Sequence, residues 1–212
     1  MREICASLHS LFNELERFTF PFATERIPCN GIYILFETGE QAHGVDRIVR
    51  VGTHTGTDQL RSRLQQHFVK ENKDRSIFRK HIGRAILHRA EEPFLEQWNW
   101  DLTTRKAKEA YGDLLDRHKQ AAVEKQVTAY IQASFSFVVF EVVDKVERLS
   151  LEAKIISTIS WCDDCRPSNA WLGLHSPEAK IRQSGLWLVN ELYKEPLSKQ
   201  EFMALRNIVE RG

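Results

Sequence analysis

Long apolar runs and a strong net charge are both missing from this sequence. None of the 212 residues belongs to a run that approaches the roughly 20 apolar residues of a membrane-spanning helix, and the first residues lack the apolar core of a signal peptide. The formal net charge is +1, so no overall basic excess indicates a nucleic-acid partner. These absences predict a cytoplasmic protein without membrane contact, in which any binding of nucleic acid depends on local basic clusters.

Cysteine is scarce, with four residues at positions Cys5, Cys29, Cys162 and Cys165. Reduced thiols are expected in a cytoplasmic protein. Cys162 and Cys165 have the spacing of half a zinc site, and the other half would have to come from Cys5, Cys29 or a histidine. Neither Cys5 nor Cys29 has a second cysteine close to it in sequence. Free thiols in a loop are therefore favoured over structural zinc.

Linkers rich in proline or glycine, internal repeats and low-complexity tracts are also absent. Hydrophobic residues make up 42% of the chain and charged residues 28%, which is ordinary for a globular protein with a real core. We therefore expect a single domain over residues 1–212. Its core should comprise about 30–70 and 134–175, with a helical insertion at about 76–132.

Three segments have the composition of β-strands. Residues 31–36 and 48–53 are rich in β-branched and aromatic side chains, and the polar stretch 37–47 between them predicts a hairpin with a long loop. Residues 134–143 begin with alternating polar and apolar side chains. The rest of the segment is almost continuously apolar, as in a strand that is covered on both faces. The chain should therefore have an α/β fold: a small three-stranded, mainly antiparallel sheet flanked by helices, with a helical C-terminus.

Helix signals surround these strands. Apolar residues recur at helical spacing over 4–18, and again over 60–68. Ser76, Ser150 and Ser198 each precede a helical pattern and are predicted N-caps. The last helix should run to about residue 211.

An ordered set of short motifs lies on these elements. Gly31-Ile32-Tyr33 begins the first strand, and Arg50-Val51-Gly52 lies at the end of the second. The helix that follows contains Arg63 and His67, and Glu152 comes after the third strand. This set resembles the GIY-YIG nuclease family. The second motif departs from the family pattern, because Arg50 stands where the family has a tyrosine.

The resemblance implies a metal-dependent endonuclease that uses Mg²⁺ or Mn²⁺ to hydrolyse DNA. Tyr33 would be the general base, Arg63 would hold a phosphate oxygen and Glu152 would bind the metal. The remaining implied members of the site are His67, Arg50 and Asn169, with Asn190 as the alternative to Asn169. Arg50 would contact phosphate or acidify Tyr33, so the lost tyrosine affects proton transfer more than binding.

Glu152 has a second interpretation as a helix-capping residue, because it lies in the first turn after Ser150. It also shares a stripe with Ile155, Ile156 and Ile159, which predicts an inward direction. An inward carboxylate costs free energy unless a cation or a donor meets it. We therefore prefer the metal ligand.

A basic stretch after the first motif helix is the best local candidate for contacts with the DNA backbone. Its members are Lys73, Arg75, Arg79, Lys80 and Arg84. A solvated helix face is the open alternative for these residues, as it is for Arg63 and His67.

The leading functional prediction is a metal-dependent DNA endonuclease with a restriction-like role. A catalytically silent nucleic-acid-binding module is the main alternative, and a nuclease acting on RNA or on repair intermediates is another. Cutting both strands of a palindrome would call for a homodimer.

Overall fold

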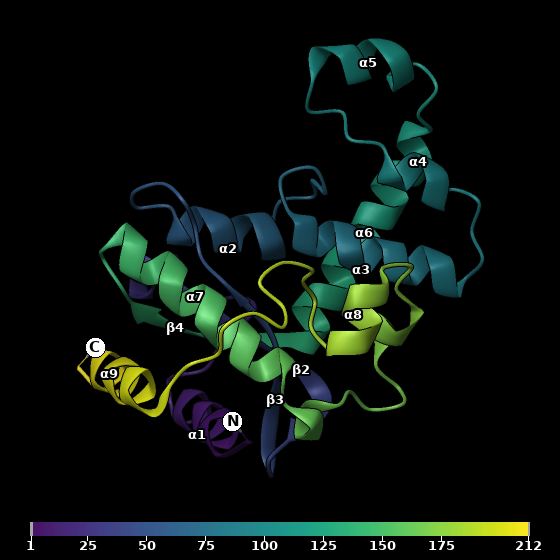
Figure 1. Ribbon diagram of the computed structural model, residues 1–212. Helices are drawn as coiled ribbons and strands as arrows, with labels where there is room; N and C mark the ends of the chain where they lie inside the picture. Colours follow the sequence, from purple (N-terminus) through teal and green to yellow (C-terminus); the bar gives the residue numbers. More distant parts are fainter. Residues whose placement is uncertain (1, 212) are drawn as a thin grey trace.

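The computed structural model describes residues 2–211 and has a mixed α/β architecture around one antiparallel sheet (Figure 1). The strand order is β1-β4-β2-β3. The strands are β1 (Phe18–Thr19), β2 (Gly31–Ala42), β3 (Val45–Gly52) and β4 (Phe135–Glu141). The α/β class and the position of the third predicted strand beside the hairpin are therefore confirmed, because β4 pairs with β2.

The predicted number of strands is wrong, because β1 adds a fourth. Phe18 and Thr19 pair antiparallel with Phe137 and Ser136 at the edge of the sheet. Two residues are too few to produce an alternating pattern in the sequence. The Phe18 ring stacks on the Phe137 ring with centroids 5.3 Å apart, so packing with a distant residue fixes this strand.

The predicted long hairpin loop is also wrong, because both strands extend through it to a two-residue turn. His43 and Gly44 form this turn with φ angles of 54° and 82°, as a type I′ hairpin turn requires. The ladder is irregular between Phe36 and Gln41. Two polar residues in this part of β2, Glu37 and Glu40, are buried and bind Trp171 and Ser168, which lie 134 and 128 residues further along the chain. Their place in a strand therefore cannot be recognised from the neighbouring sequence.

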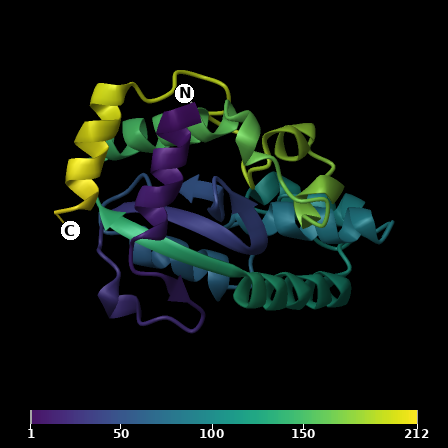
Figure 2. The ribbon, with the colours of Figure 1, turned by 90° about the horizontal axis from the view of Figure 1, so that it is seen from below.

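Helices cover both faces of the sheet, and the sheet separates two cores (Figure 2). On one face, Tyr33 and Leu35 of β2 pack against α2 (Leu60–Phe68), α3 (Ile77–Arg89) and α6 (Arg117–Ser134). On the other face, Ile32 and Ile34 pack against α1 (Arg2–Asn13), α7 (Lys145–Ser160) and α9 (Lys199–Val209). The alternation of side chains along β2 thus distributes them between the two cores.

Two of the three predicted N-caps are confirmed. The Ser76 side chain accepts a hydrogen bond from the Arg79 N–H, and Ser198 forms a capping box with Glu201. Ser150 is not a cap, because α7 begins earlier at Lys145 and is capped by Asp144. The residues of the first turn of α7 are exposed and do not continue the apolar stripe, so the sequence pattern did not indicate that the helix starts there.

The expected helical insertion has two parts. Helices α3 and α6 contribute to the core beside the sheet, and α4 (Leu95–Asn99) adds the fully buried Trp98 to it, whereas α5 (Arg105–Tyr111) has no buried residue and lies further out (Figure 1). After α7 the chain continues through η2 (Asp163–Cys165), η3 (Leu172–His175) and α8 (Ala179–Ser184), and the short turn η1 (Thr24–Arg26) precedes β2. No helix within residues 2–211 is both long and apolar enough to cross a membrane.

Candidate active site

Tyr33 and Gly52 lie directly opposite each other where β2 and β3 pair. The Tyr33 ring rests on Gly52, so a Cβ atom at position 52 would overlap the phenol oxygen and ring. The glycine of the second motif is therefore needed for close approach of a side chain to the backbone. Tyr33 itself is fully buried.

His67 of α2 meets the Tyr33 hydroxyl and forms a short relay. Its Nε2 lies 2.8 Å from the Tyr33 oxygen, and its Nδ1 lies 2.7 Å from the Ser76 hydroxyl. Burial, helped by the positive charges of Arg63, Arg50 and Arg79, holds the pKa of His67 well below its ordinary value. The imidazole is therefore neutral at neutral pH, with one nitrogen donating and the other accepting.

Arg50 occupies the place of the missing tyrosine and points to the same phenol oxygen. Its Nε lies 3.4 Å from the Tyr33 oxygen, and another guanidinium nitrogen donates to the Trp187 carbonyl. The guanidinium also lies over the Phe78 ring, 5.3 Å from its centroid. The substitution in the second motif therefore puts a buried cation beside Tyr33.

Arg79 does not belong to a DNA-binding surface, contrary to the sequence-based prediction. Its guanidinium is fully buried and pairs with Glu124 at 2.6 Å. The same group donates to the backbone carbonyl of His67 at 3.1 Å, so it supports the helix end that carries His67. A buried cation with its own counter-ion has no route to a DNA phosphate.

The rest of the predicted basic patch is mostly engaged inside the protein as well. Lys73 is buried, with its ammonium 2.7 Å from Asp74, and Lys80 is buried 3.8 Å from the same carboxylate. Arg84 is half-buried and pairs with Glu178 at 3.0 Å. Arg75 is exposed, and it is the member of the patch that lines the cleft described next.

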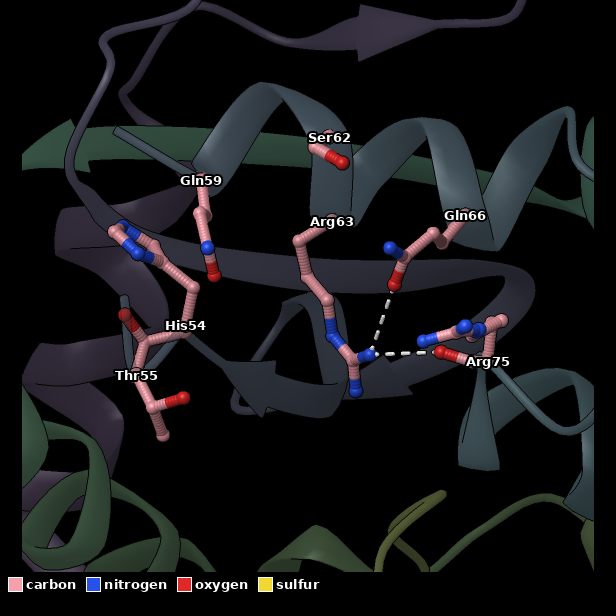
Figure 3. A pocket seen from close by; sticks show the side chains of 8 residues that line it. His54, Thr55, Gln59, Ser62, Arg63, Gln66 and Arg75 are labelled. Carbon is pink, nitrogen blue, oxygen red and sulfur yellow. Dashed lines mark hydrogen bonds between the residues drawn. The ribbon is translucent and has the colours of Figure 1, made fainter. Parts of the chain in front are cut away.

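An open cleft of about 460 Å³ lies beside this cluster, between the end of β3 and α2. Arg63 points into its centre from α2, and Arg75 faces it from the other side (Figure 3). The Arg63 guanidinium donates to the Gln66 side chain at 3.3 Å and to the Arg75 carbonyl at 3.0 Å. The other lining residues are polar: Thr53, His54, Thr55, Gln59, Ser62 and Gln66.

Glu152 reaches the same neighbourhood from the middle of α7, where it is half-buried. The capping interpretation is therefore wrong. Burial raises the pKa of Glu152, while the charge of Arg50, a backbone hydrogen bond from Thr53 and the charge of Arg63 oppose the rise. Glu152 is thus a half-buried carboxyl group that is influenced by the charges of Arg50 and Arg63, and a carboxylate oxygen is a ligand that a hard divalent cation takes.

Asn169 is not brought to this cluster. It is exposed, and the adjacent Ser168 binds Glu40, which lies seven residues along β2 from Tyr33. Asn190, the alternative, is exposed as well. Position along the chain favoured Asn169, but the loop that carries it runs to the other end of β2.

His81 and Ser76 belong to this region in ways that sequence reasoning missed. His81 of α3 is buried, and burial together with the charges of Arg84 and Arg50 lowers its pKa to about 3. Ser76 holds His67 in addition to capping α3. The cap was readable from the sequence, but no local pattern indicates that the same hydroxyl meets a histidine nine positions earlier.

Comparison with known families accounts for this arrangement. The family model described as "GIY-YIG domain" matches residues 3–211, which is nearly the whole chain. The chain therefore belongs to the GIY-YIG family, and this membership implies a nuclease-type hydrolase function. No curated protein and no solved structure matches it.

Proposed function

We propose that the chain is a metal-dependent endonuclease that hydrolyses DNA phosphodiester bonds at the cleft beside α2. One observation carries the proposal: side chains from β2, β3, α2 and α7 that are far apart in sequence cluster next to this cleft, and Arg63 of the cluster lines it. They are Tyr33, Arg50, Arg63, His67 and Glu152. Hydrolysis of a phosphodiester needs cations for the phosphoryl charge, a proton acceptor and a metal ligand, and this set provides each of them.

Substrate binding is assigned to Arg63 and Arg75. Arg63 holds two internal acceptors at the centre of the cleft, and a phosphate oxygen would replace them with charge-assisted bonds. Arg75 adds a second, exposed cation at the rim. The polar lining of the cleft suits an anionic backbone rather than an apolar ligand.

Mg²⁺ or Mn²⁺ is assigned to Glu152. A single carboxylate fits Mg²⁺, which retains several waters and takes further ligands from substrate phosphates. When bound, the ion would neutralise phosphoryl charge and lower the pKa of a coordinated water. The raised pKa of Glu152, caused first by burial, fits a carboxylate whose compensating cation comes from outside the chain.

Proton transfer is assigned to Tyr33, with His67 as a positioning residue. Because the imidazole stays neutral, its Nε2 can accept from the Tyr33 hydroxyl while its Nδ1–H donates to Ser76. This leaves a lone pair of the Tyr33 oxygen facing Arg50. Tyr33 acts as a base only after its hydroxyl proton has left for solvent. The phenolate, stabilised by the charge of Arg50, would then accept one proton from the attacking water and return to the phenol.

A catalytically silent nucleic-acid-binding protein is the second candidate, and burial of Tyr33 favours it. The ring is 0% exposed, so catalysis requires that substrate binding moves the residues that cover the phenol oxygen. The binding role needs only Arg63, Arg75 and the open cleft.

Incubation of the purified chain with supercoiled plasmid, single-stranded DNA and RNA, each with Mg²⁺, Mn²⁺ or EDTA, separates these functions. Cleavage of DNA only with a metal supports the nuclease. Binding without cleavage under every metal supports the silent binder, and cleavage of RNA alone would overturn the DNA assignment. A restriction-like double-strand cut further predicts a homodimer on DNA, which light scattering of the complex would detect.

A further inference from the structure

Four potential metal ligands meet on the far side of the sheet from Tyr33, where α1, the β2–β3 turn and η2 come together. They are Cys5, His9, His43 and Cys165, and one ligand atom of each lies within 4.8 Å of all the others. Cys5, His9 and Cys165 are buried, and His43 is partly buried. We propose that these four residues bind a structural Zn²⁺ ion.

Three separations between the ligand atoms lie within about 0.5 Å of those in a tetrahedral zinc site. Bonds of about 2.3 Å to sulfur and about 2.0 Å to nitrogen place neighbouring ligand atoms about 3.3 to 3.8 Å apart. The two sulfur atoms of Cys5 and Cys165 are 3.3 Å apart. The Cys165 sulfur lies 3.3 Å from His43 Nε2 and 3.9 Å from His9 Nε2.

Each ligand is held in place by its own part of the fold. Cys5 and His9 are four residues apart on α1 and therefore share one helix face. His43 is presented by the tight turn, where its φ of 54° puts it in the left-handed region. Cys165 ends the 3₁₀ turn η2, so the ion would join three segments that are distant in sequence.

The protonation pattern of the cluster also suits zinc. His9 Nδ1–H donates to the Cys5 carbonyl at 2.9 Å, which orients the ring and leaves Nε2 for the metal. The Ile48 N–H currently lies 3.2 Å from that Nε2, and coordination would replace this single neutral hydrogen bond. Two thiolates would neutralise the charge of the ion, which satisfies the need for pairing in a buried site.

This assignment changes the expectation for the pair Cys162 and Cys165, which was free thiols in a loop. Cys165 enters the cluster, and the second half comes from α1 and the turn rather than from Cys29. Cys162 lies at the margin, with its sulfur 3.5 Å from His43 Nε2, so it is the competing fourth ligand in place of His9. The sequence could not combine these residues, because His43 and Cys165 are 122 residues apart and no motif links them to each other or to the pair on α1.

The test is the zinc content of the purified full chain by elemental analysis, with Co²⁺ substitution to report tetrahedral thiolate ligation. We expect one zinc per chain. His43→Asn should weaken zinc binding by more than about 100-fold while keeping the turn, because asparagine tolerates the left-handed conformation. Cys165→Ser should also lose the metal, whereas Cys29→Ser, as the matched control, should retain it.

Three outcomes would overturn the proposal. The first is a chain that contains no zinc, gives no Co²⁺–thiolate absorption and melts at the same temperature with and without added zinc. The second is a Cys5–Cys165 disulfide found by mass spectrometry of the reduced-buffer preparation. The third is loss of zinc in Cys162→Ser together with its retention in His9→Gln, which would replace the proposed ligand set. None of these outcomes depends on nuclease activity.

Discussion

Replacing Gly52 by alanine tests whether the second motif serves to seat Tyr33. The added Cβ would overlap the phenol oxygen and ring of Tyr33, which is fully buried. Overpacking of this kind costs about 1–3 kcal/mol. If the ring yields, the 2.8 Å bond to His67 is lost, and leaving a buried partner unsatisfied costs about 1–3 kcal/mol more.

We therefore expect Gly52→Ala to lower the free energy of unfolding by about 2 to 6 kcal/mol, the sum of both costs. Urea denaturation measures this directly, since a slope of about 1–3 kcal/mol per molar converts the loss into a shift of the midpoint. Gly56→Ala is the matched control. The atoms nearest to its Cβ would belong to the end of the flexible, exposed Gln59 side chain, which can move aside.

A double variant identifies the cause of the loss. Phenylalanine at position 33 removes the oxygen that the new Cβ would overlap, so Tyr33→Phe should recover part of the stability lost in Gly52→Ala. If Gly52→Ala were as stable as the parent, or if its cost were the same with either ring, the reasoning about Tyr33 would be refuted.

Three further predictions concern the site and its surroundings. Tyr33→Phe alone should retain DNA affinity but slow single-turnover cleavage by roughly 10²- to 10⁴-fold, the usual contribution of a general base; undiminished cleavage rejects that role. Arg75→Ala should reduce the slope of log K against log salt by about one unit, whereas Arg79→Met should leave the slope unchanged and cost about 3–5 kcal/mol of stability by stranding Glu124; a reduced slope for Arg79→Met would return it to the DNA-binding patch. Burial lowers the pKa of His81 in the folded chain to about 3, so the unfolded chain binds this proton more readily below about pH 6.5, and His81 should lower stability by about 1 kcal/mol between pH 7 and 5.5. His67, whose pKa is also lowered, adds to the fall. His81→Gln should reduce the fall by about 1 kcal/mol in urea titrations at the two pH values, and an unchanged dependence would assign it to other groups.

The parts of the fold that sequence reasoning found are those with local signals. The hairpin strands, β4 and the caps at Ser76 and Ser198 depend on neighbouring residues, and all were predicted. The short strand β1 and the extension of β2 depend on distant partners. Glu37 illustrates the difference. Its polar side chain led to its assignment to the hairpin loop, yet it lies buried in β2, where Trp171 and Trp187 both donate hydrogen bonds to its carboxylate at 2.8 Å.

The residues of the candidate site likewise fall into those that the sequence predicted and those that depend on distant contacts. Tyr33, Arg63, His67 and Glu152 were predicted because a family resemblance orders them along the chain, and the structure brings them together. Arg79 looked like a surface cation because its partner Glu124 lies 45 residues away on another helix. Tertiary packing decides whether a charged side chain on an amphipathic helix faces solvent or a buried counter-ion. The local sequence pattern does not contain that information.

The rate of plasmid cleavage by Glu152→Gln, measured with Mg²⁺ beside the parent chain, tests the central claim most directly. The substitution keeps the shape of the side chain and removes the charge that would bind the metal. Glu147→Gln, at an exposed position of the same helix, is the control. The account predicts metal-dependent nicking by the parent and by the control, and none by Glu152→Gln, which should still fold and bind DNA. Cleavage by Glu152→Gln at the parent rate, or parent cleavage that persists in EDTA, would contradict it.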